Sequence, residues 1–108
     1  MNIAIFASGI GGLSVLYQAR RMLPEAHFLY YADEDHVPYG EKTREQILTY
    51  TDEAVRFLLE QGADAIVLAC NTATSVAAAT LRDRYPLPII GIEPAVTLAL
   101  NQDDTHRV

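Results

Sequence analysis

The sequence has 108 residues, of which half are apolar and one fifth are charged, and its formal net charge is −6. This composition is typical of one globular domain with its own core, and the single cysteine excludes an internal disulfide. The Lys and Arg residues are scattered and no apolar stretch approaches the ~20 residues of a membrane helix, so we expect neither a nucleic-acid-binding surface nor a membrane span.

The first third of the chain predicts a strand, a turn, a helix and a second strand. Residues 2–6 (NIAIF) form an apolar run that begins almost at once, so no signal peptide is expected. The glycine-rich turn SGIGG (8–12) precedes a helix that Pro24 ends, and 27–33 (HFLYYAD) is the second strand. The apolar face of that helix comprises Val15, Leu16, Ala19, Met22 and Leu23.

The middle of the chain predicts a polar loop and then a capped helix. The loop is EDHVPYGEK (34–42), and Thr43 with Gln46 three residues later is a capping-box pattern. Gly62 is suited to end the helix. The face predicted to be buried comprises Ile47, Thr51, Ala54, Val55 and Leu58.

The last third predicts two more strands and two more helices. The third strand is 65–69 (AIVLA), and the fourth is 88–92 (PIIGI). Between them lies a helix whose inner face comprises Ala73, Val76, Ala77, Thr80 and Leu81. Glu93-Pro94 fits the start of a final helix, and residues 101–108 are expected to form a frayed tail.

Strands and helices therefore alternate along the whole chain without a linker. This order predicts one α/β lobe over residues 1–108, with a flavodoxin-like parallel four-stranded sheet and helices on both faces. Ligands of such sheets bind at the carboxyl ends of the strands. The three loops expected there are residues 7–12, 33–42 and 70–74.

The glycine turn and the cysteine are the first two candidate sites. Gly9-Ile10-Gly11 matches only part of a dinucleotide fingerprint, and no Lys-Ser/Thr pair follows, so no P-loop is predicted. The turn is either a tight turn or a cradle of N–H groups for a carboxylate or phosphate. Cys70 is either a buried small hydrophobe or a reactive thiol, because a helix N-terminus stabilises a thiolate.

The remaining polar and aromatic candidates point less clearly to chemistry. His36 lies in the second loop without an evident partner and is expected to be a solvated surface residue. Three separated histidines and one cysteine do not form a metal-ligand pattern, so no metal site is predicted. The segment Pro38-Tyr39-Gly40 is either an ordinary turn or a ligand contact.

Three motifs taken together carry a resemblance to a known family. SGIGGLSVL (8–16), VPYGEKT (37–43) and ACNTAT (69–74) resemble signatures of the aspartate/glutamate racemase family, in the family's order and spacing, and the match covers residues 3–95. The resemblance implies a two-lobed enzyme that needs no cofactor. In this family two cysteines on opposite sides of an amino acid exchange its α-proton, and the glutamate racemases supply D-glutamate for peptidoglycan and cell shape in the cytoplasm.

The resemblance also assigns roles to individual residues. Cys70 matches the first catalytic cysteine, which donates and accepts the proton. Ala7 stands where the family has an aspartate that assists this transfer, so that function is expected to be lost. The second cysteine belongs to a second lobe, which these 108 residues do not include. The positions that match substrate contacts are Ser8, Pro38, Tyr39, Gly40, Asn71 and Thr72.

Three functional hypotheses follow. In the first, the chain is half of a glutamate racemase, with glutamate favoured over aspartate as substrate and no measurable racemisation by a monomer. A homodimer would bring two Cys70 thiols across one cleft and cover apolar surface. In the second, the chain is a non-catalytic flavodoxin-like module that binds a small anionic ligand at the glycine turn. In the third, it is an inactive remnant.

Overall fold

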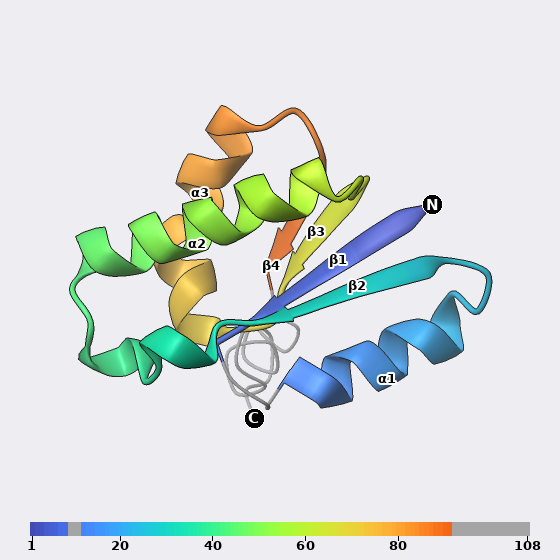
Figure 1. Ribbon diagram of the computed structural model, residues 1–108, viewed down its shortest axis with the longest axis horizontal. Helices are drawn as coiled ribbons and strands as arrows, with labels where there is room; N and C mark the ends of the chain where they lie inside the picture. The colour runs from blue at the N-terminus through green and yellow to red at the C-terminus, as the bar shows by residue number, and fades with distance from the viewer. Residues whose placement is uncertain (9–11, 92–108) are drawn as a thin grey trace, which may run out of the picture.

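A computed structural model describes residues 1–8 and 12–91 as a four-stranded parallel sheet with three α-helices (Figure 1). The strand order is β2-β1-β3-β4, and every neighbouring pair is parallel, as the sequence predicts. The strands are β1 Asn2–Ala7, β2 His27–Ala32, β3 Ala65–Leu68 and β4 Ile89–Gly91, and the helices are α1 Leu13–Met22, α2 Arg44–Glu60 and α3 Asn71–Arg84. The predicted final helix, the tail and the glycines at 9 and 11 lie outside the described residues.

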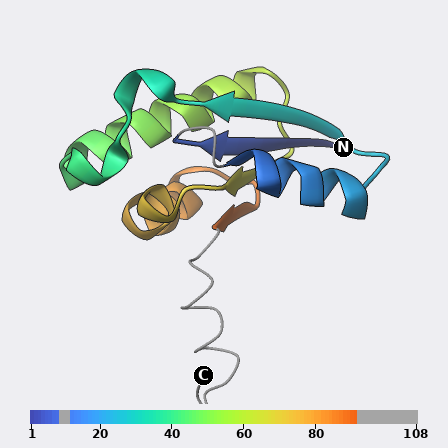
Figure 2. The same cartoon turned by 90° about the horizontal axis from the view of Figure 1, so that it is seen from below.

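The core lies between the sheet and the helices α2 and α3. Alternate residues of the central strands, such as Phe6 and Leu68, are buried in it together with side chains of both helices. The intervening residues Ile3 and Ile5 are also buried but lie outside this cluster, because alternate side chains of a strand point to opposite faces of the sheet. Helix α1 lies on that other face (Figure 1). Figure 2, turned by 90°, likewise shows α1 in front of the sheet and α2 behind it. The expected helices on both faces are therefore confirmed.

Helix α2 forms because its local sequence and its core contacts agree. Thr43 Oγ1 accepts from the Gln46 N–H at 3.1 Å, and Gln46 Oε1 accepts from the Thr43 N–H at 2.9 Å, so the predicted capping box is complete. All five residues of the predicted inner face are buried. Gly62 ends the helical segment with a φ of +94°, a conformation that residues with a Cβ rarely adopt.

Helix α1 has the predicted apolar face, but the face is only half covered. Within Leu13–Met22, all of it described, no residue is buried. Met22 is 75% exposed, and Leu23 just beyond the helix is 50% exposed. Periodicity therefore located the helix correctly but overstated its burial.

Between β2 and α2 the chain forms two short 3₁₀ turns, η2 (Glu34–His36) and η3 (Tyr39–Glu41). They occupy the loop that the sequence predicts at 34–42 and place it beside the start of α3 (Figure 1). Within residues 1–8 and 12–91, no helix is both long and apolar enough to cross a bilayer.

Candidate functional site

The ends of the first three strands meet at one edge of the sheet. In the parallel register Ala7 is paired with Ala32, and Phe6 with Leu68. The pairing continues past the strands, because the N–H of Asp33 donates to the Ala7 carbonyl at 2.9 Å and the N–H of Ala69 donates to the Phe6 carbonyl at 2.7 Å. The segments after β1, β2 and β3 therefore start side by side, as expected for ligand-binding loops of a parallel sheet.

Cys70 is the N-cap residue of α3, as its predicted position between strand and helix requires. Its backbone is extended, with φ −129° and ψ 120°, and its carbonyl accepts from the Thr74 N–H at 2.9 Å. The Ala73 N–H points at the Cys70 Sγ over 3.4 Å. Cys70 is 8% exposed, and its sulfur lies at the N-terminus of α3.

The six positions that match substrate contacts gather at the same edge. Ser8 directly follows β1, and Asn71 and Thr72 form the first turn of α3. Ser8 and Thr72 are half-buried and Asn71 is exposed, so all three residues reach the surface. Pro38 and Gly40 are exposed as well, whereas the Tyr39 side chain between them is buried.

The Tyr39 ring anchors its loop in the core. Its hydroxyl donates to Asp33 Oδ2 at 2.6 Å, and its ring packs against Phe6 and Tyr50 with centroids 6.1 and 6.2 Å away. Burial disfavours the phenolate, and the hydrogen bond to the Asp33 carboxylate and the charges of Asp33 and Cys70 act in the same direction. Together they raise the pKa of Tyr39 well above its ordinary value. Tyr39 is therefore a neutral hydrogen-bond donor here.

Asp33 and His36 are the residues that sequence reasoning missed. The Asp33 carboxylate is buried and lies 2.7 and 2.9 Å from His36 Nδ1, while the His36 ring stacks on Tyr50 with centroids 3.7 Å apart. The prediction that His36 is a solvated residue without a partner is thus wrong. The sequence feature that could have revealed this contact is the spacing of Asp33, His36 and Tyr39. They stand three residues apart, and side chains three residues apart lie on the same side of a 3₁₀ turn.

Ala7 contributes shape rather than chemistry. It is buried at the end of β1, and a Cβ built on Gly12 would lie 2.6 Å from the Ala7 Cβ and 3.0 Å from the Tyr30 hydroxyl. Glycine at position 12 therefore lets the start of α1 approach the end of β1 closely. An alanine side chain has no group that binds or moves a proton.

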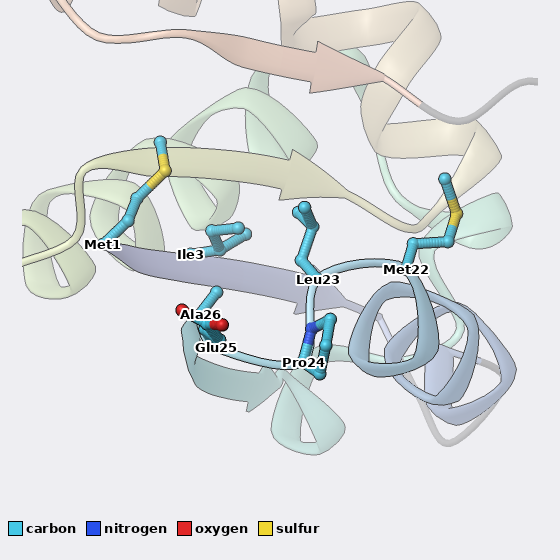
Figure 3. A pocket seen from close by; sticks show the side chains of 7 residues that line it. All are labelled: Met1, Ile3, Met22, Leu23, Pro24, Glu25 and Ala26. Carbon is cyan, nitrogen blue, oxygen red and sulfur yellow. The ribbon is translucent and has the colours of Figure 1, made fainter.

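One surface pocket lies away from this edge (Figure 3). Its lining surrounds the start of β1 and the end of α1, which is the opposite end of the strands from Cys70. The residues around it are Met1, Ile3, Met22, Leu23, Pro24, Glu25 and Ala26. With one carboxylate among apolar side chains, this pocket has none of the predicted site residues.

Comparisons with known proteins agree with the fold. The family model described as Asp/Glu/Hydantoin racemase matches residues 14–108. The glutamate racemase of Lachnospira eligens is 63% identical over 100 residues, which cover 93% of this chain and 38% of that protein. The chain thus spans about two fifths of the length of this curated relative.

Two solved structures resemble the chain closely. The glutamate racemase of Aquifex pyrophilus matches with a TM-score of 0.87 and 40% identity, covering 95% of this chain and 41% of that one. The Escherichia coli glutamate racemase, solved with L-glutamate and the activator UDP-MurNAc-Ala, matches with a TM-score of 0.86 and 36% identity over 93% and 38% of the two chains.

Proposed function

Because the chain belongs to the Asp/Glu/Hydantoin racemase family, we propose that its 108 residues form the half of a glutamate racemase that carries the first catalytic cysteine. The observation that supports this most directly is the place of Cys70. Its sulfur lies at the N-terminus of α3, at the strand edge where Ser8, Tyr39 and Asn71 also gather. The high identity with glutamate racemases supports glutamate as the substrate rather than aspartate.

In the proposed reaction, the Cys70 thiolate removes the α-proton of glutamate and becomes a thiol. A second thiol on the opposite face then gives a proton to the α-carbon, so the centre is inverted without any change of oxidation state. The backbone N–H groups at the start of α3 suit the substrate carboxylate, and Asn71 and Thr72 add hydrogen-bonding side chains. The reaction needs no cofactor, and its product serves peptidoglycan synthesis and cell shape in the cytoplasm.

The same proposal limits what these 108 residues do alone. They provide one cysteine, and Ala7 has no carboxylate to assist it. A monomer should therefore exchange the α-proton on one face at most and should not racemise glutamate. A homodimer that places two Cys70 thiols across one cleft would supply the second face, and sedimentation equilibrium at high concentration tests whether such a dimer forms.

Proton exchange in deuterated buffer tests the proposal. The chain is incubated with L-glutamate or D-glutamate, and the α-proton is followed by NMR, with Cys70→Ala as the control. We expect loss of the α-proton signal from one enantiomer, without inversion and only when Cys70 is present. The proposal would be contradicted if the α-proton signal were the same with the wild-type chain and with Cys70→Ala, for both enantiomers, and if no glutamate binding were detected.

Position 7 offers a gain-of-function test of the same chemistry. If Ala7 marks a lost proton-transfer residue, Ala7→Asp should increase the exchange rate about 10²-fold or more, which is the usual contribution of a placed acid–base group. The matched control is Ala79→Asp, since Ala79 is exposed on α3. If both variants exchanged the α-proton at the same rate, the missing carboxylate at position 7 would not explain low activity.

A second candidate function, a non-catalytic module that binds a small anion at the glycine turn, is favoured by Ala7 and by the start of α1, which follows this turn. The first turn of that helix has no acidic residue, and its N-cap Gly12 makes no side-chain capping bond. Its N–H groups are therefore suited to an anionic ligand. Glutamate binding that is unchanged in Cys70→Ala, without proton exchange, would favour this function.

A further inference from the structure

We propose that Asp33 is a positioning residue, which acts through Tyr39 to hold the Pro38–Gly40 segment against the start of α3, beside Cys70. Its functional part, that this segment binds glutamate beside the thiol, rests on the proposed function. Its structural part, that Asp33 orders the segment, rests only on the contacts of Asp33, His36 and Tyr39 and is tested separately.

Asp33 is itself fixed on two sides. Its N–H donates to the carbonyl of Ala7, so its backbone is attached to the end of the central strand β1. Its carboxylate is 6% exposed and accepts both the Tyr39 hydroxyl at 2.6 Å and His36 Nδ1 at 2.7 Å. Hydrogen bonds to an ionised acceptor are the strong ones, and a buried carboxylate depends on its donors. Asp33 thereby connects both 3₁₀ turns to the sheet.

The loop is held from α2 as well. The His36 ring stacks on Tyr50 of α2 at 3.7 Å with an angle of 13° between the rings, and Tyr39 also packs against Tyr50. Because a carboxylate only accepts hydrogen bonds, Asp33 places the hydrogen of a neutral His36 ring on Nδ1. The Asp33 carboxylate is hydrogen-bonded to both Tyr39 and His36, and the Tyr50 ring packs against both of them.

The consequence for the site follows from what Tyr39 adjoins. The turn η3, which begins at Tyr39, packs on α3, and Tyr39 and Cys70 belong to the same buried cluster. The exposed backbone of Pro38 and Gly40 is therefore presented at a fixed place relative to the thiol. Binding groups must be held within a fraction of an ångström to be effective.

Amide hydrogen exchange tests the structural part. The N–H groups of Glu41 and Lys42 bond to the carbonyls of Pro38 and Tyr39 at 3.2 and 3.0 Å, so their exchange reports whether η3 is ordered. In Asp33→Ala we expect both to exchange about tenfold faster, as loss of a hydrogen bond to a charged acceptor implies. The control is Asp35→Ala, which removes an exposed carboxylate from η2 and should change neither amide.

Alkylation of Cys70 by iodoacetamide tests the functional part. Without ligand, the pH profile of alkylation should be the same in the wild-type chain and in Asp33→Ala, because the helix N-terminus that surrounds the sulfur is unchanged. The glutamate concentration that half-protects Cys70 should rise about tenfold in Asp33→Ala and stay unchanged in Asp35→Ala. If Asp33 only stabilised the fold in general, Asp33→Ala would change both measurements or neither, rather than the protection by glutamate alone.

The outcomes are distinguishable. If neither enantiomer protects Cys70 in the wild-type chain, the proposed function fails, and amide exchange still decides the role of Asp33. If Asp33→Ala and Asp35→Ala behave alike at Glu41 and Lys42, the positioning role is overturned. If Asp33→Ala also accelerates amide exchange in β3, the substitution disturbs the whole fold. Tyr39→Phe is then the test variant, since it keeps the ring and removes only the hydroxyl that donates to Asp33. Unchanged exchange in Tyr39→Phe would overturn the proposal.

Discussion

Gly12→Ala tests the close contact between the start of α1 and the end of β1. Gly12 has φ −76° and ψ −7°, which alanine adopts without strain, so the backbone itself gives no reason for a loss of stability. The added Cβ, however, would lie 2.6 Å from the Cβ of Ala7 and 3.0 Å from the hydroxyl of Tyr30. The Ala7 Cβ is attached directly to a buried central strand, so it cannot turn away as a long side chain would.

The size of the effect follows from two opposing contributions. Overpacking a buried contact costs about 1–3 kcal/mol, because neighbouring atoms must shift. Replacing glycine by alanine at a compatible backbone conformation stabilises by about 0.4–1 kcal/mol through the unfolded chain. We therefore expect the free energy of unfolding of Gly12→Ala to fall by about 1–2 kcal/mol. For a domain of this size that loss lowers the melting temperature by roughly 5–10 °C.

Gly40→Ala is the matched control. A Cβ on Gly40 meets no atom within 4 Å, and the φ of Gly40 lies outside the left-handed region. Its unfolding free energy should therefore rise by about 0.4–1 kcal/mol, so the two substitutions are expected to have opposite signs.

Urea unfolding followed by far-UV circular dichroism measures both variants. Adding Ala7→Gly to Gly12→Ala removes the opposing Cβ, and the double variant should lose less stability than the sum of the two single changes. Equal effects of Gly12→Ala and Gly40→Ala, or strict additivity with Ala7→Gly, would refute the steric argument.

Three further predictions follow. Thr43→Ala removes the acceptor for the Gln46 N–H and should lower the unfolding free energy by about 1 kcal/mol in urea titrations; no change would mean that core packing alone forms α2. The raised pKa of Tyr39 means that the folded state holds this proton more tightly than the unfolded state. Stability should therefore fall as pH rises above about 10, less steeply in Tyr39→Phe, and parallel pH curves would contradict this. Tyr85→Phe removes a 2.8 Å hydrogen bond to the buried carboxylate of Asp52, between α3 and α2. It should lower the free energy of unfolding by about 1.5–3 kcal/mol, measured by thermal unfolding. A loss below about 0.5 kcal/mol, the usual size of a surface change, would argue that water replaces the bond.

Much of the fold could be predicted because local and periodic signals agree with it. The capping box at Thr43 and the 3.6-residue period of α2 depend only on residues within a few turns, and both are observed. The place of Cys70 followed from an apolar strand and the polar residues after it. The catalytic and binding roles came from the family resemblance, and they stay predictions until the exchange experiment is done.

The tertiary structure decided which side chains are buried and which side chains contact one another. The same apolar period that is fully buried in α2 leaves Met22 exposed in α1, because a hydrophobic pattern does not specify how much neighbouring chain covers it. The sequence alone therefore determined the order of strands and helices and the position of the single thiol at a helix start. Only the folded sheet placed the loop that holds Asp33, His36 and Tyr39 beside this thiol, because contacts between the loops that follow β2 and β3 depend on strand register and packing.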